Sequence, residues 1–134
     1  MVIIAGMNVL AVGMEDRAGE FKGLPIRLLN LTHGHDAIRS FKTDPIDSVV
    51  SRWHLADMPN GEFLKKLKAA KPDMPTVAII EPNNPQQEIE ARTLGVNAVI
   101  TEDCDVQSLR EVMTLVFGLS DADSIKELYT VSGY

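Results

Sequence analysis

The sequence predicts an α/β domain in which a doubly wound, five-stranded parallel sheet carries helices on both faces. Three features predict this fold. Short runs rich in Val and Ile alternate with longer segments of helical periodicity, most of these runs are apolar throughout, and turn-forming residues bound them. Continuously apolar strands are typical of a parallel sheet that helices cover on both faces. The alternation of strands and helices indicates the crossovers that join parallel neighbours.

Five segments are expected to form the strands, because each is short, rich in β-branched residues and bounded by Gly, Pro, Asn or Asp. They are Asn8–Val12, Ile26–Leu31, Asp47–Ser51, Thr76–Ile80 and Asn97–Ile100. The first strand has an alternative at Val2–Ala5, followed by a helix over Gly6–Phe21. We prefer Asn8–Val12, because the alternative places Gly13 inside a helix, where glycine is unfavourable.

Four segments have the periodicity of amphipathic helices. They are His35–Phe41, Gly61–Ala70, Pro85–Leu94 and Val106–Phe117. Asp105 is suited to cap the last of these helices, whose buried stripe is expected to contain Val106, Leu109, Met113 and Val116. The first crossover, Met14–Leu24, contains Gly19 and Gly23, so its helix is expected to be abbreviated.

Residues 1–118 are expected to form the domain, and residues 119–134 a C-terminal extension. Within the extension, Asp121–Tyr129 predicts a short helix whose apolar side consists of Ala122, Ile125, Leu128 and Tyr129. A helix of this length is unstable in water unless its apolar side is buried. It therefore either covers the last helix of the domain or packs against a second copy, and we favour a symmetric dimer.

Composition excludes several classes of protein. The chain of 134 residues is long enough for one domain core, and its formal charge of −6 disfavours nonspecific binding to nucleic acid or anionic lipid. A single cysteine, Cys104, excludes a disulfide framework within the chain. No segment approaches the roughly 20 apolar residues of a membrane helix, and Met1–Gly6 lacks the basic start of a secretory signal. These features predict a cytoplasmic protein.

Patterns of catalysis or metal binding are weak. No P-loop, GxGxxG or Ser–His–Asp pattern is present, so we expect neither an enzyme nor a cofactor. His33 and His35, with His54 further along, could ligate a transition metal. The start of a helix explains the first two equally well, and we expect no metal site.

A more specific pattern lies at Asp47–Leu64, with the sequence DSVVSRWHLADMPNGEFL. This stretch resembles the third strand and following loop of response-regulator receiver domains. Lys71–Ile80, Glu90–Ile100 and Asp103–Val116 follow in the order and spacing of that family, so the resemblance covers about Asn8–Phe117. It implies a flavodoxin-like fold with strand order 2-1-3-4-5 and a role in bacterial two-component signalling.

The resemblance also implies where the family's phosphorylation chemistry would lie, and none of those positions carries the expected residue. The phosphoacceptor aspartate is replaced by Arg52, and the acidic pair that holds Mg²⁺ by Gly13 and Met14. The hydroxyl residue that ends the fourth strand is replaced by Glu81, and the lysine after the fifth strand by Glu102. We therefore expect Arg52 to face the two glutamates in a degenerate pocket, which an arginine can close by charge-assisted hydrogen bonds.

Four further residues near these positions are candidates for a role in the site or its contacts. Asp16 follows Glu15 just after the acidic-pair positions, and both are expected to lie past the pocket. Asp57 lies five residues after Arg52, so we expect a turn residue and not a relocated phosphoacceptor. Trp53 is expected to be half exposed beside the strand end, either as a contact anchor or packed over the loop.

The usual interaction surface of the family implies a surface here on Pro85–Leu94, Asn97–Ile100 and Val106–Phe117. Its outward residues, with those of the extension, are expected to be Gln86, Gln87, Glu90, Arg92, Asn97, Gln107, Arg110, Glu111, Thr114, Ile125, Leu128 and Tyr129. The domain part mixes charges and lacks a large apolar patch, so self-association through it should be weak or salt-sensitive. We expect a phosphorylation-independent module that binds another signalling protein. The alternative is an atypical receiver that still responds to phosphate or another small anion through Arg52.

Overall fold

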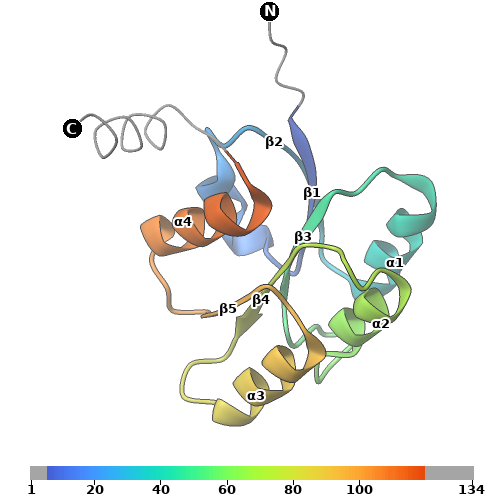
Figure 1. The fold of residues 1–134 in the computed structure, drawn as a ribbon, viewed down its shortest axis with the longest axis vertical. Coiled ribbons are helices and arrows are strands. Elements are labelled where there is room, and N and C mark those ends of the chain that lie inside the picture. The colour runs from blue at the N-terminus through green and yellow to red at the C-terminus, as the bar shows by residue number, and fades with distance from the viewer. Residues whose placement is uncertain (1–5, 120–134) are drawn as a thin grey trace, which may run out of the picture.

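The computed structural model describes residues 6–119, whose elements are shown in Figure 1. The strands are β1 (Met7–Val12), β2 (Ile26–Leu31), β3 (Ser48–Arg52), β4 (Thr76–Ile80) and β5 (Ala98–Thr101). A 3₁₀ segment, η1 (Glu15–Phe21), forms the first crossover. The α-helices are α1 (Gly34–Thr43), α2 (Glu62–Ala70), α3 (Pro85–Leu94) and α4 (Val106–Phe117).

The five strands form one parallel sheet in the order β2-β1-β3-β4-β5, which confirms the predicted fold class and strand order. β1 extends the preferred first strand by one residue, and the alternative at Val2–Ala5 lies outside the described residues. Val12 pairs with Ser51, Arg52 with Ile79, and Ile80 with Thr101. The carboxyl-terminal ends of these strands therefore meet at one edge of the sheet.

Side chains of the inner strands alternate between two apolar layers. Leu10, Val49 and Ala78 belong to the layer on the face that α1, α2 and α3 cover. Their chain neighbours Val9, Val50 and Val77 belong to the opposite layer, beneath η1 and α4 (Figure 1). Because both faces of these strands are buried, the strands appear in the sequence as uninterrupted apolar runs.

One side chain of α4 departs from the predicted stripe. Leu109 and Met113 are buried as expected, but Val106 is 46% exposed, because it lies in the first turn, before the helix reaches the core. Phe117 is buried at the other end of the helix instead. The side chains with which α4 packs into this layer therefore run from its second turn to its carboxyl-terminal end.

The extension remains a prediction, because Asp121–Tyr129 lies outside the described residues, together with its apolar side chains. The described chain ends just after α4, at Leu119, whose N–H donates to the carbonyl of Thr114. Within residues 6–119, each helix is too short or too polar to span a bilayer.

Candidate functional site

The candidate site lies at the edge where β1, β3, β4 and β5 end. In open parallel sheets, ligands bind outside the carboxyl ends of the strands, where the order of strands reverses. Here the sheet reverses at β1, which pairs with β2 on one side and β3 on the other. Arg52 is the last residue of β3, and Glu102 directly follows β5, where its N–H donates to the carbonyl of Ile80 at 2.8 Å. The edge of the sheet therefore holds an arginine at the position to which the resemblance assigns the phosphoacceptor.

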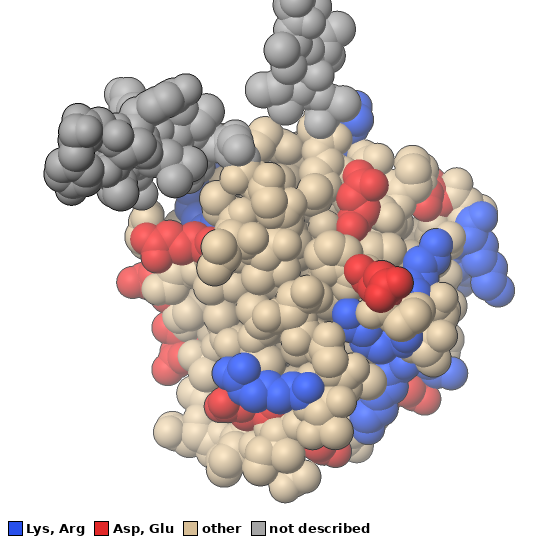
Figure 2. All heavy atoms as spheres, viewed as in Figure 1, with Lys and Arg blue, Asp and Glu red and all other residues tan. Residues whose placement is uncertain are grey.

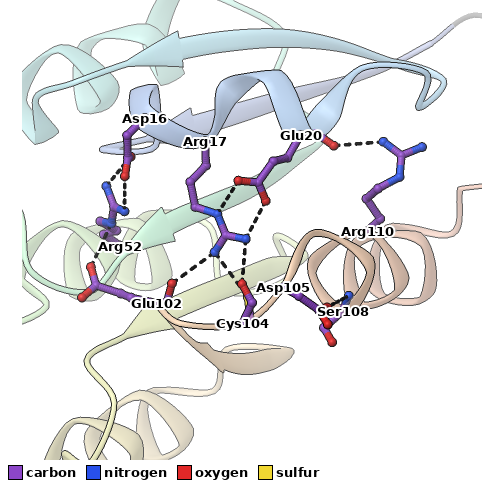
Figure 3. Close-up of polar contacts among 9 residues, drawn as sticks. All are labelled: Asp16, Arg17, Glu20, Arg52, Glu102, Cys104, Asp105, Ser108 and Arg110. Atoms are coloured by element: carbon purple, nitrogen blue, oxygen red, sulfur yellow. Dashed lines mark hydrogen bonds and ion pairs between the residues drawn. The ribbon is translucent and has the colours of Figure 1, made fainter.

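The guanidinium of Arg52 is held by three partners, of which Figure 3 shows Asp16 and Glu102. Its Nη1 and Nη2 donate to the two carboxylate oxygens of Asp16 at 2.7 and 2.9 Å, and Nη1 also donates to the carbonyl of Gly13. Oε1 of Glu102 lies 2.9 Å from Nε, which makes an ion pair. This carboxylate lies off the N–H direction, so Nε is the one buried side-chain nitrogen or oxygen within residues 6–119 without a hydrogen bond.

These contacts fix the charges of the site. The hydrogen bond to Asp16 is the main cause that raises the pKa of Arg52 above its ordinary value, although burial opposes it. The same hydrogen bond lowers the pKa of Asp16 below its ordinary value. Both groups are therefore ionised near neutral pH, and a permanent cation lies between two carboxylates.

Gly13 and Met14, to which the resemblance assigns the acidic pair, also lie where carboxylates would not fit. Gly13 has a left-handed backbone with φ of 70°, and a Cβ built on it would lie 2.7 Å from Cδ2 of Leu55. Met14 is fully buried in the layer beneath η1 and α4. An aspartate at Gly13 would therefore require both a strained backbone and a displaced leucine.

Arg52 does not meet both of the glutamates that the sequence places around it. Glu102 is a partner of Arg52. The carboxylate of Glu81 instead accepts a hydrogen bond from the side chain of Asn84 at 3.3 Å, and the backbone N–H of Glu81 donates to the side-chain oxygen of Gln87. Asp16, expected past the pocket, takes that place. The reason is that η1, which only two residues separate from β1, brings Asp16 back over the strand ends.

A second arginine centre lies beside the first and was not foreseen from the sequence. Arg17 is only 8% exposed, and it donates through Nε and Nη2 to both carboxylate oxygens of Glu20. The same guanidinium donates to the carbonyls of Glu102 at 3.3 Å and Cys104 at 2.9 Å, and lies 3.4 Å from Sγ of Cys104 (Figure 3). The hydrogen bond to Glu20 is the main cause that raises the pKa of Arg17. The only signal in the sequence is the i,i+3 spacing of Arg17 and Glu20.

Asp57 lies in a turn, as expected, because the N–H of Met58 donates to the carbonyl of Leu55 at 3.2 Å, but its side chain has a further role. Its carboxylate accepts from the N–H groups of Gly34 and His35 at 2.9 and 3.0 Å, and lies 2.6 Å from Nδ1 of His35. Burial opposes ionisation of Asp57, but these hydrogen bonds outweigh it and lower its pKa to about 2. Asp57 therefore ties the β3–α2 loop to the N-terminus of α1 and lies away from the Arg52 centre. Within residues 6–119, no three His, Cys, Asp or Glu side chains are grouped to hold a metal.

Trp53 is buried, which corrects the expectation of a half-exposed side chain. It is 1% exposed and packs with the residues beneath α1 and α2. The loop closes over its ring at Gly61, whose φ is 76° and where a Cβ would overlap the indole. Trp53 is therefore part of the core and does not serve as a contact anchor.

Three residues of the expected interaction surface use their side chains to bind the backbone of other segments. The side chain of Gln87 accepts from the N–H of Glu81, and that of Asn97 accepts from Thr76. Arg110 donates to the carbonyls of Glu20 and Lys22. The domain part of the surface also exposes large apolar side chains. Ile89 and Leu115, the latter 83% exposed, were not singled out from the sequence, and Val106 was expected in the buried stripe.

Comparison with known proteins identifies the fold. A scan against protein-family models and a search of curated proteins found no match. Among solved structures, the signal receiver domain of an HD domain-containing protein from Pseudomonas fluorescens Pf-5 has a TM-score of 0.75 at 16% identity, over 84% of this chain and 95% of that one. A CheY-like response regulator receiver domain protein from Methanospirillum hungatei JF-1 has a TM-score of 0.73 at 16% identity, over 91% and 98%.

A third similar structure carries a bound ion. The receiver domain of a sensor histidine kinase from Pseudomonas aeruginosa PAO1 has magnesium coordinated in its active site cleft; its TM-score is 0.73 at 16% identity, over 85% of this chain and 99% of that one. These likenesses show that the chain has the receiver-domain fold, as its resemblance in sequence implied.

Proposed function

We propose that this protein is a pseudo-receiver, a module of receiver fold that binds another protein of a bacterial two-component pathway without being phosphorylated. The observation that supports the proposal is the Arg52 centre. A guanidinium cannot form an acyl phosphate, and this one is held in place by Asp16 and Glu102.

The residues present do not fit the Mg²⁺ on which phosphorylation of receivers depends. Mg²⁺ is a hard cation that binds carboxylate oxygens and water in octahedral geometry. The three positions that would supply those oxygens carry Gly13, the buried Met14 and the cation of Arg52. The carboxylates that do lie nearby, Asp16 and Glu102, are already paired with the guanidinium.

The Arg52 centre supplies internally the kind of contact that a phosphoryl group makes elsewhere. The bidentate pair of Arg52 and Asp16 consists of two charge-assisted hydrogen bonds with fixed geometry. Because both partners belong to the chain, no ligand is needed to form the pair. The protein is therefore expected to present one conformation of its partner surface at all times.

The partner surface in this proposal is formed by α3, β5 and α4. Ile89, Val106 and Leu115 are large apolar side chains exposed on its two helices. Figure 2 shows acidic side chains along the edge beside α4, whereas Lys and Arg gather on the side of α1 and α2. A partner with an apolar centre and a basic rim would fit this surface. A second copy of the chain, joined here or through the C-terminal extension, is the alternative occupant.

The proposal is tested by a titration with BeF₃⁻ and Mg²⁺, followed by amide NMR. BeF₃⁻ mimics the phosphoryl group on an aspartate, so a pseudo-receiver is expected to show no saturable shift at Gly13, Arg52 or Glu102. A saturable shift that requires Mg²⁺ at these residues would overturn the proposal.

A second candidate function is a receiver that responds to a small anion through Arg52. It is favoured by Nε of Arg52, which is paired with Glu102 but makes no hydrogen bond, and by Asp16, whose side chain is 60% exposed and so can be displaced by an incoming anion. Titration with inorganic phosphate in the absence of Mg²⁺ separates this candidate. Saturable shifts at Asp16 and Arg52 would support it, and their absence would exclude it.

A further inference from the structure

Glu102 belongs to both arginine centres at once. Its carboxylate lies 2.9 Å from Nε of Arg52, while its backbone carbonyl accepts from Nη1 of Arg17 at 3.3 Å (Figure 3). The two polar groups of one residue thus meet two different guanidinium groups. A change in the position of Glu102 therefore alters its contacts with both Arg52 and Arg17.

Arg17 extends this link into the β5–α4 connection, residues 102–105. Its guanidinium binds two carbonyls of the connection, those of Glu102 and Cys104, and is held on its other side by Glu20. The connection leads directly into α4, where the carboxylate of Asp105 accepts from the N–H of Ser108 at 2.7 Å. One buried arginine therefore fixes the path by which the chain enters α4.

Arg110, which belongs to α4, makes a second polar connection between α4 and η1. Its Nη1 donates to the carbonyl of Glu20 at 2.9 Å and to that of Lys22 at 2.6 Å, both at the end of η1. η1 is therefore bound to the β5–α4 connection through Arg17 and to the second turn of α4 through Arg110. These three segments are joined side by side by polar contacts above the apolar layer that they share (Figure 3).

We infer that Glu102 and Arg17 couple the Arg52 centre energetically to the first two turns of α4. Without the cation of Arg52, the carboxylate of Glu102 loses its counter-charge and is expected to turn toward water. That movement draws the carbonyl of Glu102 away from Arg17 and loosens the connection. The inference rests on the proposed function only in that it makes α4 part of the partner surface. The permanent cation of Arg52 then keeps that surface rigid.

Amide hydrogen exchange of the full chain tests the coupling through two matched variants, Glu102→Gln and Glu81→Gln. Each removes one carboxylate at the same edge of the sheet, but only Glu102 contacts the two arginines. In Glu102→Gln, exchange of residues 104–110 is expected to rise roughly threefold or more, since local opening there becomes easier. In Glu81→Gln it should stay as in the wild type. Equal exchange over residues 104–110 in both variants would overturn the inference.

A double-mutant cycle shows whether the effect passes through Arg17. The effect of Arg52→Met on amide exchange is measured alone and in the background of Glu20→Gln. The second substitution weakens the ion pair with Arg17 and leaves the guanidinium of Arg17 in place. The increase in exchange that Arg52→Met causes at residues 104–110 should shrink by about half in that background, and simple additivity would contradict the route. Neither measurement uses phosphoryl chemistry. Binding of BeF₃⁻ could therefore overturn the proposed function and leave the coupling intact.

Discussion

The two arginine centres lie side by side but are built in different ways. Arg17 is buried and binds backbone carbonyls and a half-buried carboxylate, so its partners are fixed by the fold. The side chain of Arg52 is 22% exposed, and its main partner, Asp16, is largely exposed. The difference indicates that Arg17 is architectural, whereas Arg52 is the centre whose partners can exchange. Mutations at the two sites should therefore lower the unfolding free energy by different amounts, and the two losses should differ in their sensitivity to salt.

The largest effect is expected at Arg17. In Arg17→Met, the carboxylate of Glu20 and the carbonyls of Glu102 and Cys104 lose their donor together. Breaking such a buried pair costs about 3 kcal/mol of unfolding free energy, because the remaining groups stay poorly solvated. Denaturant unfolding measures the loss. A loss below about 1 kcal/mol, the range of exposed pairs, would show that Arg17 is not architectural.

A smaller effect is expected at Arg52. Arg52→Ala leaves Asp16 and Glu102 without their cation, but both can turn toward water. The loss should be about 1–2 kcal/mol, between the values for exposed and buried pairs. It should shrink as salt is raised, because exposed charges are screened. A loss that is unchanged between low and high salt would place Arg52 with Arg17, and a melting curve identical to that of the wild type would mean that the pair contributes nothing.

Asp57 offers a comparison outside both centres. Its pKa of about 2 lies below the ordinary value, so its contribution is present above that ordinary value and is lost as pH falls through the folded pKa. Asp57→Asn should therefore cost about 1 kcal/mol at pH 7, as for a lost helix cap, and much less near pH 2. Unfolding curves at the two pH values check this. An equal cost at both would show that the charge of Asp57 is not what stabilises α1.

The smallest effect is expected where an aspartate is restored. Arg52→Asp returns the phosphoacceptor but leaves Gly13, Met14 and Glu102 unchanged, so no metal site is completed. We expect this variant to remain unphosphorylated by acetyl phosphate in the presence of Mg²⁺. Intact-mass analysis directly after the reaction is the measurement. Stable incorporation of one phosphoryl group would mean that the acidic-pair positions are dispensable here.

The fold could be predicted from the sequence because its determinants are local and repeated. The inner strands β1, β3 and β4 are largely apolar on both faces, and turn residues separate the strands from amphipathic helices, so bounds differed from prediction by only one or two residues. The ends of parallel strands share an edge, which also placed Arg52 and Glu102 in the same region. Both inferences need only the periodicity of each element.

The partners in the site could not be predicted, because they depend on loop conformations. Asp16 and Arg17 reach their partners only because the first crossover is a 3₁₀ turn, which the sequence showed merely as an abbreviated helix. The burial of Trp53 depends on the left-handed backbone of Gly61, and Asp57 on the path of the β3–α2 loop. None of these conformations leaves a periodic signal.

The most direct test of the pseudo-receiver account is phosphoryl transfer to the wild-type protein. The full chain is incubated with a phosphorylated histidine kinase or with acetyl phosphate and Mg²⁺, and its intact mass is followed beside a phosphorylatable receiver domain as positive control. The control is expected to gain the mass of one phosphoryl group, whereas a pseudo-receiver gains none. A gain of one phosphoryl group by this protein that is lost on removal of Mg²⁺ would contradict the pseudo-receiver account.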